Sequence, residues 1–159
     1  MRRDRIAFFL TLITSTVLIA QGQRAATADR DAIVAFAHKT ALQAVNFRQG
    51  DIESLARSRP NFTADAWKDF MKHMEGFLDQ KGAPTFGSSF VPSGKAMVLG
   101  EEKGIVHLRI LGTLKQTQNL SSTIYRGAAI DVFAGGQPTR IQRLEQLTCG
   151  GAGCQFPPR

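Results

Sequence analysis

The sequence has few cysteines and lacks several well-known binding and catalytic motifs, which excludes some classes of protein. Its two cysteines, Cys149 and Cys154, are too few for a disulfide-rich scaffold or for a zinc site made of four thiolates. It has no phosphate-binding glycine loop, no dinucleotide fingerprint and no nucleophile motif of the Gly-x-Ser-x-Gly type. No long run of basic residues follows residue 28, so we do not expect nucleic-acid binding.

What remains is the composition of an ordinary globular protein. Hydrophobic residues make up 43% of the chain and charged residues 21%, which excludes a wholly disordered chain. A length of 159 residues fits one domain. The net charge of +7 falls to +4 without residues 1–28, which hold four arginines and one aspartate. A small positive excess of this size is normal for a soluble surface.

The N-terminus has the layout of an export signal. Arg2, Arg3 and Arg5 precede an apolar run over residues 6–20, which is shorter than the roughly 20 residues of a comfortable transmembrane helix. Small-x-small sites end at Gly22 and at Ala28. Residues 1–28 are therefore either a cleaved signal peptide or a short uncleaved inner-membrane anchor. Both interpretations place the rest of the chain in the periplasm.

Two helices are expected after the leader. Apolar residues recur with helical spacing over residues 33–45. A second helix should begin at Thr63, which is a good N-cap, with Phe62 and Trp67 placed as a hydrophobic staple. Gly82 and Pro84 predict its end.

Four strands are expected next, over residues 86–99, 104–117, 121–134 and 139–149, because runs rich in β-branched residues alternate with turn residues. The last element could be a helix, since its apolar residues are spaced by three. We favour a strand, because a three-stranded sheet would leave a long apolar edge. The order of helices and then strands predicts an α+β fold with an antiparallel sheet, in a domain of residues 29–149 followed by a Gly/Pro-rich tail of residues 150–159.

Three segments then resemble a known family. They are residues 44–48, residues 61–72 with the pattern set by Asn61, Phe62, Thr63, Trp67 and Phe70, and residues 91–96. Together they resemble the IcmL/DotI family, inner-membrane components of type IVB secretion systems that are related to the conjugation protein TraM. The resemblance covers about residues 30–148.

The resemblance implies two N-terminal helices packed on a strongly curved four-stranded antiparallel sheet, as in NTF2-like or cystatin-like folds. It implies a non-enzymatic assembly component of a type IV secretion apparatus, without a cofactor. Its partners would be other envelope subunits, further copies of itself and, if the leader is not cleaved, the inner membrane. The short N-terminal run and the cysteine-containing tail depart from the family pattern.

The main alternative is a stand-alone periplasmic domain of the same fold that binds a small apolar ligand or transfers protons. Its pocket would contain His107, Tyr125 and Asp131, with Tyr125 and Asp131 on one face of the third strand. Their positions alternate with the apolar set, so we expect these side chains to face water. We therefore favour the assembly role and assign no catalytic residue.

The histidines and cysteines give two further expectations. His38, His73 and His107 are not spaced as metal ligands, so we expect no metal site. Cys149 and Cys154 enclose a flexible loop that can close as a structural disulfide in an oxidising compartment. The alternatives are two free thiols or a bridge between protomers.

Overall fold

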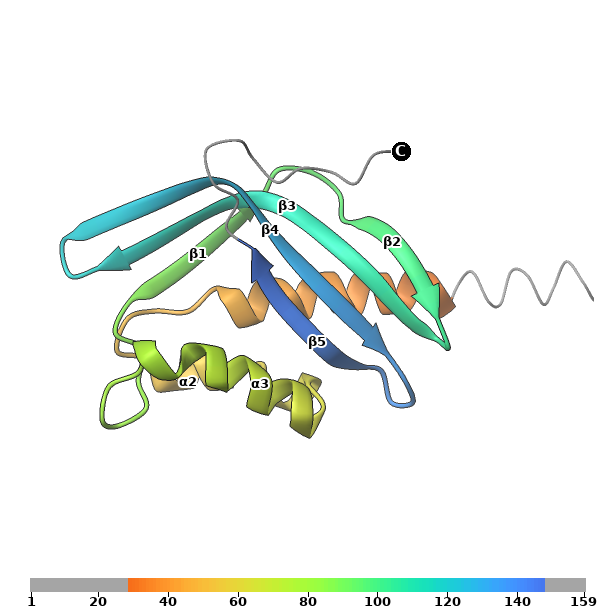
Figure 1. The fold of residues 1–159 in the computed structure, drawn as a ribbon, viewed down its shortest axis with the longest axis horizontal. Helices are drawn as coiled ribbons and strands as arrows, with labels where there is room; N and C mark the ends of the chain where they lie inside the picture. The colour runs from red at the N-terminus through yellow and green to blue at the C-terminus, as the bar shows by residue number, and fades with distance from the viewer. Residues whose placement is uncertain (1–28, 148–159) are drawn as a thin grey trace, which may run out of the picture. The chain divides into compact units, whose positions relative to one another are not determined.

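The protein has an α+β fold in which helices come first and an antiparallel sheet follows (Figure 1). The computed structural model describes residues 29–147. Residues 33–147 pack together as one unit. Residues 29–32 belong to a second unit and are helical. None of the helices within residues 29–147 has the length and apolarity needed to cross a membrane.

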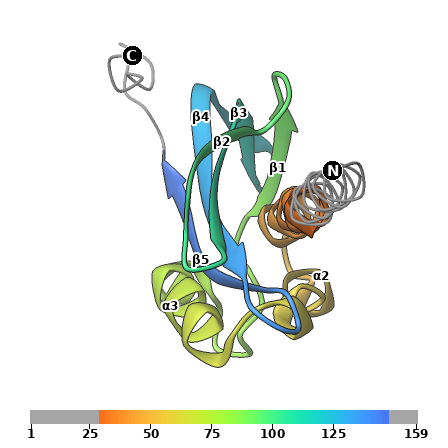
Figure 2. The same cartoon turned by 90° about the vertical axis from the view of Figure 1, so that its right-hand side faces the viewer.

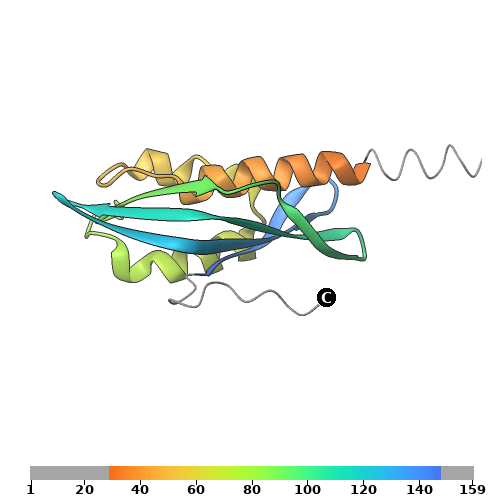
Figure 3. The same ribbon diagram turned by 90° about the horizontal axis from the view of Figure 1, so that it is seen from above.

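The first helix covers residues 29–45, as the apolar spacing predicts. Its buried side chains repeat every three or four positions and are mostly small, so the helix can approach the sheet closely; they are Ile33, Ala37, Thr40, Ala41, Ala44 and Val45. Figure 3 shows residues 33–45 of this helix running alongside the strands.

The helix α3 (Ala64–Met74) begins where the sequence predicts. The Thr63 hydroxyl accepts a hydrogen bond from the Ala66 amide at 3.3 Å, and the Phe62 and Trp67 rings meet edge to face with centroids 5.4 Å apart. The predicted end at Gly82 is wrong. The chain tightens into a 3-10 turn at Glu75–Phe77 and then becomes extended at Leu78.

The expected count of two helices is also wrong. A further short helix, α2 (Ile52–Ala56), lies between them, and a 3-10 turn (Arg59–Asn61) follows it. The Asp51 carboxylate starts α2 by accepting a hydrogen bond from the Ser54 amide at 2.9 Å. An aspartate cap followed by a single helical turn gives too short an apolar pattern to be recognised from periodicity.

The sheet has five strands rather than the four expected. Its members are β1 (Gly87–Pro92), β2 (Met97–Glu102), β3 (Ile105–Gln118), β4 (Ser121–Gly135) and β5 (Arg140–Leu147). The single strand expected over residues 86–99 is two strands, β1 and β2, which both pair with β3. Pro92 has no amide hydrogen and the chain loops at Ser93, whose amide binds the Leu111 carbonyl at 2.8 Å.

The last element is a strand, as we favoured. β5 pairs with residues 129–135 of β4, and the cross-strand pairing outweighs the helix-forming preference of Arg143 and Glu145. α3 lies beside β5 (Figure 2), and the Thr63 amide donates to the Ile141 carbonyl at 3.0 Å. The start of α3 is thereby fixed to the sheet.

One continuous core fills the space between the helices and the sheet. Alternate residues of β3 and β4 point into it and are fully buried; they are Val106, Leu108, Ile110, Leu114, Ala128, Ile130, Val132 and Ala134. Phe70 and Met74 of α3, and Phe62 directly before its N-cap, add their side chains to this core. The covered face of the sheet is therefore filled by side chains from its own strands and from the helices.

Candidate functional site

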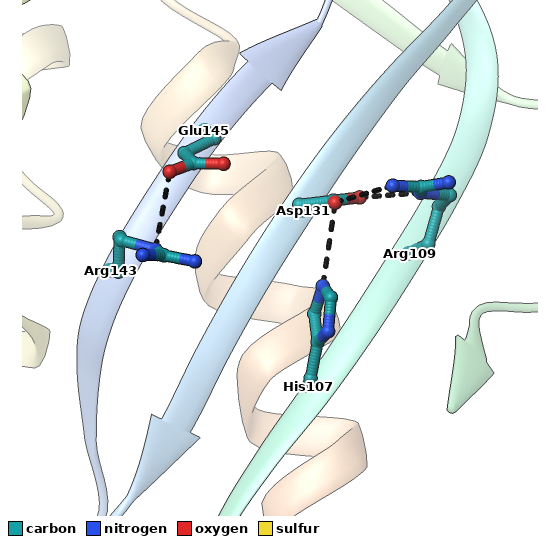
Figure 4. A network of polar contacts seen from close by, with 5 residues as sticks. All are labelled: His107, Arg109, Asp131, Arg143 and Glu145. Carbon is teal, nitrogen blue, oxygen red and sulfur yellow. Dashed lines mark hydrogen bonds and ion pairs between the residues drawn. The ribbon is translucent and has the colours of Figure 1, made fainter. Parts of the chain in front are cut away.

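A network of polar side chains lies on the sheet face opposite the helical residues 33–45 (Figure 4). Arg109 of β3 and Asp131 of β4 are direct cross-strand neighbours. The Arg109 Nε and Nη2 atoms donate to the two carboxylate oxygens of Asp131, each at 2.7 Å. Asp131 is only 4% exposed, so this two-point ion pair is shielded from water.

His107 and Arg143 extend the group across three strands. His107 Nε2 lies 3.4 Å from Asp131 Oδ2, and its ring stacks on Phe133 with centroids 4.0 Å apart. The Arg143 guanidinium lies over the Phe133 ring at 3.9 Å and pairs with Glu145 at 3.2 Å. We call these residues (His107, Arg109, Asp131, Phe133, Arg143 and Glu145) the outer-face cluster.

The electrostatics of the outer-face cluster favour the charged form of Asp131. Burial raises the pKa of the Asp131 carboxyl, but the hydrogen bonds and charge of Arg109, with a smaller contribution from His107, outweigh burial and hold that pKa below its usual value. The hydrogen bond to Asp131 raises the pKa of Arg109. A carboxylate that accepts two hydrogen bonds from a guanidinium is a poor general base, because catalysis near neutral pH needs a raised pKa.

Tyr125 lies on the other face of the sheet, so the expected grouping with Asp131 is wrong. Thr113 pairs with Arg126 and Gly112 with Ala128, which leaves Gly127 as an extra residue in β4. Gly127 has φ +77°, a conformation that favours glycine, and the bulge reverses the alternation of side chains that follow it. Tyr125 therefore packs beside the core, while Asp131 points to the outer face.

The expectation that these side chains face water is also wrong for Asp131. It assumed that the face opposite the apolar residues is solvated throughout. Over β3, β4 and β5 the long side chains of Arg109 and Arg143 and the Phe133 ring cover this face instead. The sequence did contain a signal for this contact, because opposite charges at alternating positions of neighbouring strands form cross-strand pairs.

The five residues of the family-like pattern meet at the start of α3. The rings of Phe62, Trp67 and Phe70 lie 5.4–5.8 Å apart, and Thr63 caps the helix. Asn61 ends the preceding 3-10 turn, its amide bound to Ser58 at 3.0 Å. This arrangement explains the pattern as packing and capping rather than as chemistry.

Asn46 joins the first helix to the sheet, although it is not among the site residues predicted from the sequence. Its side-chain oxygen accepts a hydrogen bond from the Phe90 amide at 2.6 Å, where the neighbouring Phe47 forms an antiparallel bridge with Ser88. A polar residue directly after a helical stripe is the signal that points to such a role.

An apolar cleft lies between α3 and the sheet. It has a volume of about 590 Å³, and Phe70, Met74, Phe77 and Phe86 line it together with polar residues of β5. Phe77 is half exposed. A soft aromatic and methionine surface of this kind suits a protein contact.

Two expectations concern metals and cysteines. Within residues 29–147, no three histidine, cysteine, aspartate or glutamate side chains are grouped to hold a metal ion. Cys149 and Cys154 lie outside the described residues, so their pairing stays a prediction.

Comparison with solved structures identifies proteins of the same fold. The periplasmic domain of DotI matches with a TM-score of 0.61 and 14% sequence identity, over 75% of this chain and 95% of that domain. An IcmL-like type IV secretion system protein from Legionella pneumophila matches with a TM-score of 0.57 and 13% identity, over 80% of this chain and 97% of the other. No family model and no curated protein matches the sequence. The resemblance inferred from sequence is thus confirmed for the fold.

Proposed function

We propose that the protein is a non-enzymatic assembly component of a type IV secretion apparatus of the IVB, conjugation-like kind. The observation that carries this proposal is the shared fold, which extends over almost the whole of the DotI periplasmic domain and of the IcmL-like protein. The family-like pattern of residues 61–72 was found independently in the sequence and supports the same role.

Residues 29–149 would act as a periplasmic protein–protein interaction domain. Residues 1–28 would export the chain or anchor it in the inner membrane, and residues 150–159 would form a tail. The partners would be other envelope subunits and further copies of the chain. The exposed aromatic side of the cleft between α3 and the sheet supports this use, because apolar side chains open to solvent are typical of interaction surfaces.

The alternative, ligand binding or proton transfer, has less support. Asp131 is paired with both Arg109 and His107, and Tyr125 lies on the opposite face. The covered face of β3 and β4 is filled by fully buried apolar side chains. The arrangement therefore lacks the desolvated, unpaired base that proton transfer requires.

Cross-linking in the native envelope tests the proposal. The full chain carrying a C-terminal affinity tag would be cross-linked in the organism that encodes it and purified from the periplasmic and membrane fractions together. We expect secretion-system subunits among the bound proteins, at levels above those bound by an unrelated tagged periplasmic protein. Recovery of no secretion subunit, with the tagged chain intact, would contradict the proposed role.

A further inference from the structure

The strand β4 is paired with a neighbouring strand at both of its edges along only half of its length. β3 pairs with it from end to end, whereas β5 pairs with residues 129–135. Among residues 29–147, the segment of residues 121–126 pairs with β3 alone. Figure 1 shows the hairpin of β3 and β4 extending beyond the end of β5. We call residues 121–126 the β4 edge.

The β4 edge has few of the features that usually prevent an edge strand from pairing with another chain. Natural edges are protected by charges, prolines or coverage. This segment has no proline and one charged residue, Arg126, at its end. Thr123, Ile124 and Tyr125 favour strands, and Ile124 is 56% exposed. By contrast β2, at the other side of the sheet, carries Glu101 and Glu102.

We infer that the β4 edge pairs in antiparallel fashion with the β4 edge of a second copy, about a two-fold axis at Ile124. This register sets Ser122 opposite Arg126 and Thr123 opposite Tyr125, so that no like charges face each other. The exposed Ile124 side chains of the two copies meet and leave water. A surface that complements itself in this way fits a closed two-fold interface.

The chain's own C-terminal residues are a less favourable partner for the β4 edge than a second copy is. The residues that follow β5 include Gly150, Gly151 and Gly153, which contribute no side chains to a sheet and lose much conformational freedom on ordering. The inference concerns the geometry of β4 and does not depend on the secretion role.

Disulfide trapping tests the pairing in the full-length chain. In a background with Cys149→Ser and Cys154→Ser, Ile124→Cys is compared with Lys115→Cys. Lys115 is the direct neighbour of Ile124 on β3 and is exposed on the same face, which makes it a matched control. In the proposed dimer the Cβ atoms of the two Ile124 positions would be about 5 Å apart. The two Lys115 positions would be about 15 Å apart, because β3 lies one strand further from the two-fold axis in each copy.

We expect mild oxidation of intact cells that express each variant to give a covalent dimer with Ile124→Cys and none with Lys115→Cys, on non-reducing gels. Equal cross-linking of the two variants would overturn the inference. So would the absence of a dimer, or trapping of Ile124→Cys to a different protein.

A second measurement separates pairing from folding. Ile124→Lys places two like charges opposite each other, so we expect the purified full-length protein in detergent to lose its dimer in sedimentation experiments. Ile124→Val should retain the dimer. Both variants should unfold at the temperature of the wild-type monomer, since the side chain is exposed. A dimer that persists in Ile124→Lys would exclude this edge as the interface.

Discussion

The Asp131 carboxylate is held by contacts that substitution can remove one at a time. Its two hydrogen bonds to Arg109 are both 2.7 Å, and its side chain is almost completely buried. A buried ion pair contributes little net stability, but the loss of one partner leaves an uncompensated charge. We therefore assign this pair a role in the structure of the sheet.

Arg109→Met should lower the free energy of unfolding by about 3 kcal/mol, because the Asp131 charge stays buried without its main partner. Lys103→Met is the matched control, since Lys103 forms an exposed pair with Glu102 and its loss should cost no more than about 0.5 kcal/mol. Urea unfolding at neutral pH measures both. Adding Asp131→Asn to Arg109→Met should recover part of the loss, and equal losses for the two single variants would contradict the assignment.

The same pair predicts a pH dependence. The folded-state pKa of Asp131 is lowered, so its stabilising contribution is present above the unfolded pKa of about 3.9 and is lost as the pH falls through the folded pKa. The stability difference between wild type and Asp131→Asn should thus be constant near neutral pH and shrink below about pH 4. Unfolding curves between neutral and acid pH check this, and a constant difference throughout would contradict it.

At the scale of elements, the parts set by short-range chemistry are predictable from the sequence. Thr63 and its aromatic neighbours place the start of α3, and the alternation of Val106, Leu108 and Ile110 places the buried face of β3. Features that depend on a neighbouring strand are not predictable in this way. The break after Pro92 becomes visible only once β1 and β2 both pair with β3.

The bulge at Gly127 shows why the candidate site was predicted incompletely. A period-two argument assumes an unbroken strand, so one extra residue moved Tyr125 to the opposite face from Asp131. An isolated glycine within a strand pattern is a known sign of a bulge, but the positive φ that confirms it belongs to the folded chain. The same register change left Ile124 exposed, although Ala128 and Ile130 are buried.

Close contact between β1 and β3 gives a test at this scale. A Cβ atom on Gly112 would overlap the Val91 carbonyl oxygen and the Phe90 ring, so Gly112→Ala should destabilise the protein by about 2 kcal/mol. Gly100→Ala is the control, because a Cβ there meets no atom within 4 Å. Thermal unfolding should separate the two variants. Similar melting temperatures would show that the strands do not pack as described.

At the scale of the whole molecule, the fold is shared with secretion proteins despite sequence identities of 13–14%. Such a fold is preserved by the pattern of buried positions rather than by particular residues, since many apolar side chains can fill one core. The match therefore supports the proposed role through architecture, and the contacts with partners depend on the surface of this chain.

The proposed processing of the N-terminus has a direct test. We expect N-terminal sequencing of the protein from its own organism to find a start near Gln23 or Asp29, with the protein in the soluble periplasmic fraction. An intact Arg2 in the inner-membrane fraction would contradict cleavage and identify residues 1–28 as an anchor instead.

The central claim is that the chain is required as part of a type IV secretion apparatus. The most direct measurement is the transfer of cargo by that apparatus in a strain from which the gene has been deleted, with the intact gene supplied on a plasmid as the control. The account predicts that transfer is lost on deletion and restored by the plasmid. Transfer at the wild-type rate in the deletion strain would contradict it.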